Sequence, residues 1–111
     1  MEIKDKILIA EEFSKTPGAR YVKDGGKFSG EIFLKDILRP RLDKAIEENY
    51  ILEIILDGAL GYPSSFISGS FGKLSLEKTA SLMLKHIVFV SEDNPLRAEK
   101  IIYQIEKPKK K

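Results

Sequence analysis

Apolar positions change their spacing along the chain, and each spacing predicts a different kind of element. The stretch Ile3 to Glu11 places Ile7 and Ile9 on one face, which predicts a first strand. From Ser29 to about Asn49, apolar residues recur at three and four positions, which predicts a helix. Pro40 interrupts this pattern, so two helices and one kinked helix both remain open.

The second half of the chain alternates between continuous apolar runs and helical patterns. Ile51 to Leu56 is nearly all apolar, which predicts a strand buried on both faces of a sheet, and His86 to Val90 predicts another strand. Two helices are expected between these strands. The first begins near Ser64-Ser65, and the second runs from about Ser75 to Lys85. Asn94-Pro95 predicts the capped start of a last helix, with a buried stripe at Ala98, Ile101, Ile102 and Ile105. Strands alternating with helices predict an α/β domain with a mostly parallel or mixed central sheet and flanking helices.

Length and charge predict one domain with a basic tail. At 111 residues the chain is expected to form a single domain over residues 1–106. The net charge of +2 depends on residues 107–111, which carry four lysines; without them, 15 basic residues stand against 17 acidic ones. The tail is typical of a solvated chain end. A phosphate-binding arm is the alternative, but no basic stripe or stacking aromatics accompany it, which makes nucleic acid the less favoured partner.

Residue types argue against most catalytic chemistry. The chain has no cysteine and one histidine, His86, which excludes thiolate sites and disfavours histidine-based metal sites and Ser-His-Asp catalysis. Ser-x-x-Lys occurs twice, at Ser70–Lys73 and Ser75–Lys78, without its companion motifs. We therefore expect no enzyme activity, no cofactor and no metal. No apolar run is long enough for a signal peptide or a spanning helix, so a cytoplasmic location away from membranes is expected.

The loop after the Ile51–Leu56 run carries the most specific signal. It runs from Asp57 through Gly61 and Tyr62 to Ser64-Ser65, where a helix is expected to begin. Free N–H groups at a helix start favour an anion, so the two serines are candidates for a phosphate or phosphorylation site. Plain helix capping explains them equally well.

The helix that follows has one face made only of small residues. Its apolar face holds Ile67, Phe71 and Leu74, and the opposite face carries Ser65, Ser68, Gly69 and Gly72. Two interior glycines cost about 1 kcal/mol each relative to alanine, so the absence of side chains needs a reason. Either another backbone of the same domain packs there, or the face stays flat for a partner, in which case Phe66, Ser68, Gly69 and Gly72 belong to an interaction surface.

Arg20, Ser29 and Glu31 form a second candidate group. Ser29 is expected to cap the next helix with Glu31 in its first turn. Arg20 either forms a structural ion pair or lies beside the Ser64-Ser65 loop, where a guanidinium would recognise phosphate.

Three separated motifs resemble one known family. They read Phe-Ser-Lys-Thr-Pro-Gly-Ala-Arg from Phe13, Gly-Gly-Lys-Phe-Ser-Gly-Glu-Ile-Phe from Gly25, and Ser-Ser-Phe-Ile-Ser-Gly-Ser-Phe-Gly-Lys-Leu from Ser64. Together, over about residues 7–105, they look like the bacterial STAS-like domain of unknown function DUF4325.

The resemblance implies a STAS-like fold and a regulatory role. The strand-loop-serine-helix element is similar to that of anti-sigma-factor antagonists, in which a serine at this helix start is phosphorylated by a GHKL-type ATPase kinase. Relatives of the family are often joined to such ATPases or encoded near them. This chain departs from the antagonists at Pro63, where they carry an acidic residue, and from its own family at Ser68-Gly69, where an acidic pair is usual.

We therefore expect a non-enzymatic regulatory or protein-interaction domain with a GHKL-type ATPase as partner and Ser64 or Ser65 as phosphoacceptor. The alternative is a small nucleotide- or nucleic-acid-binding component that uses the Ser64-Ser65 loop and the lysine tail. An enzyme fragment that completes an active site only in a complex is the least favoured hypothesis.

Overall fold

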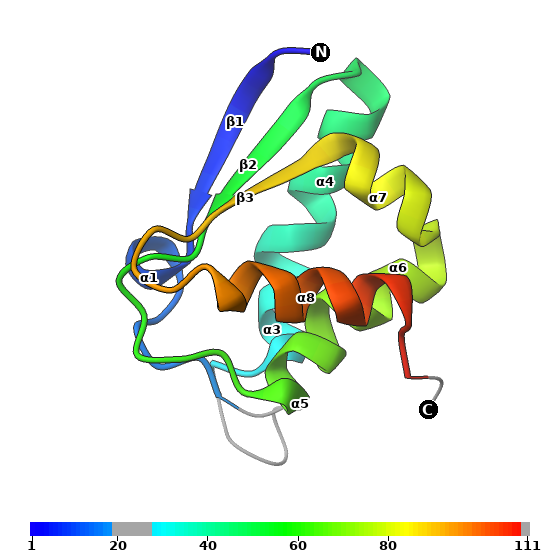
Figure 1. Ribbon diagram of the computed structural model, residues 1–111. Helices are drawn as coiled ribbons and strands as arrows, with labels where there is room; N and C mark the ends of the chain where they lie inside the picture. Colours follow the sequence, from blue (N-terminus) through cyan, green and yellow to red (C-terminus); the bar gives the residue numbers. More distant parts are fainter. Residues whose placement is uncertain (19–27, 110–111) are drawn as a thin grey trace.

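A parallel sheet forms the centre of the fold. In the computed structural model, which describes residues 1–18 and 28–109, the strands β1 (Ile3–Leu8), β2 (Ile51–Ile55) and β3 (Ile87–Val90) pair in the order β1-β2-β3 (Figure 1). Both pairings are parallel. The α/β class with a parallel sheet and flanking helices is thus confirmed.

Helical segments connect the strands. The short α1 (Ile9–Glu12) follows β1 directly. The connection to β2 contains α3 (Gly30–Phe33), a π-helical turn (Leu34–Leu38) and α4 (Arg39–Glu48). The connection to β3 contains α5 (Ser64–Ile67), a second π-helical turn (Ser68–Gly72), α6 (Lys73–Lys78) and α7 (Ala80–His86). The last helix is α8 (Leu96–Glu106).

The structure answers the question that Pro40 left open. Residues 30–48 form one continuous helical run, in which the π-helical turn ends at Leu38, two residues before Pro40. In that turn the Arg39 N–H donates to the Leu34 carbonyl five residues earlier. Because proline has no N–H to donate, a wider turn at this place lets the helix continue without two separate helices forming.

Several predicted boundaries are wrong. His86, expected to open the third strand, ends α7 instead, and β3 begins at Ile87. The first strand ends at Leu8, and residues 9–12 are helical, because the Leu8 N–H donates to the Glu12 carboxylate (3.0 Å) and the Ile9 carbonyl accepts from Phe13. The helix expected over Ser75–Lys85 is divided at Thr79, whose φ of 86° ends α6. The Thr79 hydroxyl oxygen then accepts from the Leu82 N–H and caps α7.

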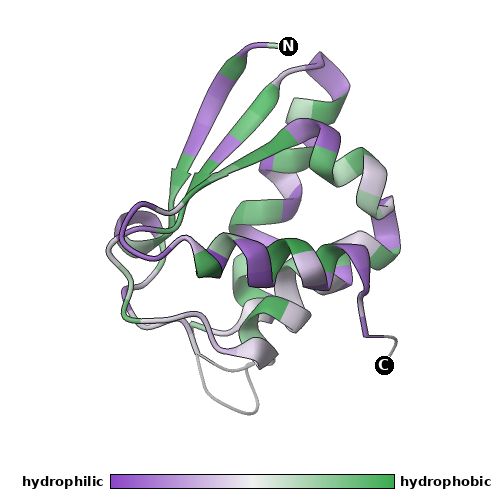
Figure 2. Cartoon of the chain, in the orientation of Figure 1, coloured by the Kyte–Doolittle hydropathy of each residue, from purple (hydrophilic) through white to green (hydrophobic). Residues whose placement is uncertain are grey.

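The helices cover one face of the sheet (Figure 1). Connections between parallel strands of one sheet are right-handed almost without exception. Two successive connections that lead in the same direction across the sheet therefore lie on the same face of it. Along β2, Leu52 and Ile54 are fully buried, whereas Ile51, Glu53 and Ile55 are partly exposed. The prediction that this strand is buried on both faces is therefore wrong, although its apolar colouring is plain in Figure 2.

A close backbone contact joins the two helical connections. A Cβ at Gly30 would lie 2.5 Å from the Phe66 carbonyl oxygen, 3.1 Å from Gly69 C and 3.2 Å from Ser70 N. The rings of Phe33 and Phe66 pack beside this contact, with centroids 5.5 Å apart. Only glycine at position 30 allows the two helices to approach this closely.

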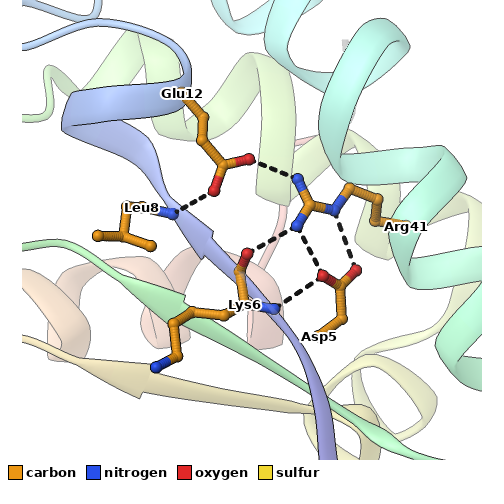
Figure 3. Close-up of polar contacts among 5 residues, drawn as sticks. All are labelled: Asp5, Lys6, Leu8, Glu12 and Arg41. Atoms are coloured by element: carbon orange, nitrogen blue, oxygen red, sulfur yellow. Dashed lines mark hydrogen bonds and ion pairs between the residues drawn. The ribbon is translucent and has the colours of Figure 1, made fainter.

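An ion-pair cluster anchors β1 to α4 (Figure 3). Arg41 donates to both carboxylate oxygens of Asp5 (3.0 and 2.6 Å), to Glu12 (2.6 Å) and to the Lys6 carbonyl (2.6 Å). These hydrogen bonds from Arg41 lower the pKa of Asp5 below its ordinary value, against the opposing effect of burial.

We predict that Gly30→Ala destabilises the fold by about 1–3 kcal/mol, because the new methyl group overlaps a backbone carbonyl that cannot move aside. Gly61→Ala is the matched control, since no atom lies within 4 Å of its Cβ position. Urea denaturation of both variants measures the difference. Equal stability of the two variants would show that the helices have room to separate.

We predict that Asp5→Asn lowers the free energy of unfolding by about 1 kcal/mol at pH 7, the range of a partly exposed ion-pair network. The pKa of Asp5 is lower in the folded chain than in the unfolded chain, where it is about 3.9. Its contribution is therefore present above that value and is lost as the pH falls through the folded pKa. Denaturation over a pH series from 7 downward measures it, with the substitution Asp36→Asn at an exposed position as the control. A difference that does not shrink as the pH falls below about 3.9 contradicts the assignment.

Candidate functional site

The loop after β2 is held against the start of α8. Arg97 donates to the carbonyl oxygens of Ala59 (2.9 Å) and Leu60 (3.2 Å), and its guanidinium lies 5.7 Å from the centre of the Tyr62 ring. The Leu60 N–H donates in turn to the Lys15 carbonyl (2.7 Å). The conformation of this loop therefore depends on residues from both ends of the chain.

Asp57 joins the loops that follow β2 and β3. Its carboxylate accepts from the Asp93 N–H (2.7 Å), and the Gly58 N–H donates back to the Asp93 carboxylate (3.2 Å). The Gly58 hydrogen bond, with a smaller contribution from Asp57, lowers the pKa of Asp93. Gly58 itself has a φ of 93°, which favours glycine at this turn. Asp57 was expected in the loop site, and its observed contacts are structural.

Tyr62 packs inward at the end of this loop. Its hydroxyl donates to the Leu56 carbonyl (2.8 Å), its ring packs 6.3 Å from that of Phe66, and burial raises the pKa of its hydroxyl. Gly61, directly before it, is partly exposed and has open space beside it.

The two candidate serines differ in their surroundings. Both are exposed at the start of α5, and neither side chain caps the helix. The Gln104 amide donates to the Ser64 hydroxyl oxygen (3.2 Å) and to the Ser64 carbonyl (3.4 Å). The capping explanation is therefore wrong for this pair, and only Ser64 lines the groove between α5 and α8.

This α5–α8 groove has a volume of about 620 Å³. Its apolar part includes Leu96 and Tyr103, which are 59% and 60% exposed. Its charged part, from α8 and the chain beyond it, includes Lys100, Lys107 and Lys109 together with the acidic Glu99. Exposed apolar side chains beside several cations are typical of a surface that binds another molecule.

Three of the four residues on the small face of the predicted helix, Ser68, Gly69 and Gly72, lie inside the fold, whereas Ser65 is exposed. Gly69 contacts Gly30 of α3, and a Cβ at Gly72 would lie 3.8 Å from the Gln104 carbonyl of α8. Ser68 is only 7% exposed and Phe66 is fully buried. The close-packing interpretation is thus confirmed, and the expectation that Phe66, Ser68, Gly69 and Gly72 form an open interaction surface is wrong.

The second candidate group lies at the start of α3. Ser29 is fully buried, and its hydroxyl oxygen accepts from the Ile32 N–H (3.3 Å), which confirms the predicted cap. Glu31 lies exposed in the first turn. Arg20 lies outside the described residues.

The residues considered for catalysis have structural partners. His86 is buried, and its Nδ1 donates to the Tyr50 carbonyl (2.9 Å). The hydroxyls of Ser70 and Ser75 are buried and donate to the carbonyls of Phe66 and Ile105. Among residues 1–18 and 28–109, no three histidine or carboxylate side chains are grouped closely enough to hold a metal ion.

Sequence reasoning missed the exposed face of α8. The helix was interpreted only through its buried stripe, whereas the groove uses Leu96, Lys100, Tyr103 and Gln104. Lys100 follows Leu96 by four positions, and Tyr103 and Gln104 follow Lys100 by three and four positions. This spacing places them in a second stripe along the same helix. Two large apolar residues in it, outside the buried stripe, were the available signal.

The chain matches no protein-family model, and comparison with curated proteins and with solved structures gives no significant match. Within the described part of the chain, each helix is too short or too polar to span a bilayer.

Proposed function

We propose that this chain is a non-enzymatic regulatory domain that binds a protein partner through the α5–α8 groove, and that phosphorylation of Ser64 controls this binding. The position of the Ser64 hydroxyl in the groove, hydrogen-bonded to Gln104, carries the proposal. The resemblance to STAS-like domains supports a GHKL-type ATPase as the partner and the kinase.

The chemistry of the groove supports both parts of the proposal. Leu96 and Tyr103 offer apolar area that a partner would remove from water, and tyrosine is frequent among residues that dominate interface energies. A phosphate on Ser64 would add about 1.5 to 2 negative charges in a groove that Lys100 and Lys107 also line. Charge-assisted hydrogen bonds to these lysines would change the shape and charge presented to the partner.

Incubation with ATP and a GHKL-type ATPase encoded beside the gene, followed by mass-spectrometric mapping, tests the phosphorylation. We expect phosphate on Ser64, its loss in Ser64→Ala, and its retention in the matched control Ser65→Ala. Absence of phosphate from both serines together with absence of a complex contradicts the proposal.

Binding through the groove has its own test. We predict that Tyr103→Ala weakens the complex with the ATPase about tenfold, the effect of losing a central aromatic contact. Leu76→Ala is the matched control, because Leu76 is also exposed but lies outside the groove. Calorimetric titration measures both variants; equal affinities would place the partner on another surface.

A second candidate function rests on the same groove. Tyr103 is exposed beside Lys100, Lys107 and Lys109, and an aromatic ring among cations suits a nucleotide or a single-stranded nucleic acid. Under this hypothesis, a labelled oligonucleotide would bind with a steep salt dependence. Deletion of residues 107–111 would reduce the salt slope, and Tyr103→Ala would weaken binding at every salt concentration. If fluorescence anisotropy detects no binding of the oligonucleotide at low salt, the nucleic-acid hypothesis is rejected.

A further inference from the structure

The strand β1 lies at an edge of the sheet. In the order β1-β2-β3 it pairs only with β2, so among residues 1–18 and 28–109 no strand lies along its other side. Successive residues of a strand direct their N–H and C=O groups alternately to the two sides. Lys6 and Leu8 direct theirs to the outer edge, where the bonds described next are formed, and Ile7 between them faces β2.

Three polar backbone groups on this outer edge are bonded to side chains (Figure 3). The Lys6 N–H donates to the Asp5 carboxylate (2.8 Å), and the Lys6 carbonyl accepts from Arg41 (2.6 Å). The Leu8 N–H donates to the Glu12 carboxylate (3.0 Å). Arg41 also donates to both carboxylates, which holds the three side chains together along the strand. The groups that an added strand would use are therefore already bonded within the chain.

The same side chains fill the space that an added strand needs. Paired strands lie about 4.8 Å apart, and their N–H groups lie about 2.9 Å from the carbonyl oxygens that they bind. A guanidinium nitrogen of Arg41, 2.6 Å from the Lys6 carbonyl oxygen, lies where such an N–H would lie. The side chains of Asp5, Arg41 and Glu12 are 24%, 30% and 35% exposed, so they pack along the edge instead of extending into water.

Anchoring of α4 to β1 does not explain the whole cluster. For that purpose the ion pair between Asp5 and Arg41 is enough, whereas Asp5 and Glu12 also accept from N–H groups of β1 itself. Edge strands with free backbone groups pair with strands of other chains unless they are short, charged or covered. β3, at the opposite edge, has four residues, and β1 has six. The longer edge strand is thus the one with a side-chain cover.

We propose that the outer edge of β1 is a latent strand-pairing site, which Asp5, Glu12 and Arg41 keep closed in the folded chain. The cluster acts as an autoinhibitory contact, since its side chains occupy the backbone groups through which a strand would be added. The proposal does not depend on the function of the α5–α8 groove, because none of the residues that line the groove belongs to the cluster.

A chain without the cluster tests the proposal. The triple variant Asp5→Ala, Glu12→Ala, Arg41→Met removes the two acceptors and the guanidinium and keeps an unbranched stem at position 41. The strand available for pairing in this variant is β1 of a second copy, with Lys6 opposite Leu8 in an antiparallel pair. In sedimentation equilibrium up to about 1 mM, we expect its mass to rise above 12.6 kDa.

The matched control removes the same charges from helices alone. Arg39 of α4 donates to both carboxylate oxygens of Glu77 on α6 (3.0 and 2.5 Å). These hydrogen bonds, with a smaller contribution from Asp43 on α4, raise the pKa of Arg39. The control variant is therefore Arg39→Met, Asp43→Ala, Glu77→Ala. We expect the variant without the edge cluster to associate at least about tenfold more tightly than this control.

NMR of a mixture of isotope-labelled and unlabelled triple variant shows where the copies meet. Contacts between copies at Lys6 and Leu8 support the proposal. A variant that stays monomeric overturns the proposal, as does one that falls short of the expected difference from the control or that associates without these contacts.

Circular dichroism shows whether the triple variant folds. If it does not, hydrogen exchange of the unmodified chain decides the question, because a closed edge protects its outward amides as well as those that face β2. Protection factors at Lys6 and Leu8 within about tenfold of that at Ile7 support the proposal, and a lower value at either residue overturns it.

Discussion

The contact between Gly30 and the backbone of residues 66–70 is the constraint on which the helical layer depends. It sets the distance between the two helical connections, and at that distance the rings of Phe33, Phe66 and Phe71 pack into one cluster. A larger residue at position 30 would move α5 away from α3. Because Ser64 begins α5, the same contact also fixes where the candidate phosphoacceptor lies relative to α8.

The direction of the crossovers explains both surfaces of the molecule. Two right-handed crossovers in one direction fill a single side of the sheet, and α8 then returns over the helices already there. Its packing against Gly72 closes the small face of the second connection, and its exposed residues form a wall of the groove. Among residues 1–18 and 28–109, the same topology leaves the outer sheet face, opposite the helices, without a covering helix. The groove and the bare face are thus two consequences of one chain path.

The fold class, the strands and most helix starts could be predicted because they depend on local patterns. Ser29 caps α3 as expected, and the Asn94 side chain accepts from the Leu96 N–H at the start of α8. The prediction that β2 is buried on both faces was wrong, because a continuous apolar run does not show which face of the sheet the helices cover. The helix at residues 9–12 was missed because a buried Ile9 fits the pattern of a strand and that of a helix equally well. At the site, Ser64 and Ser65 are indistinguishable in sequence, and only the packing of α8 separates them.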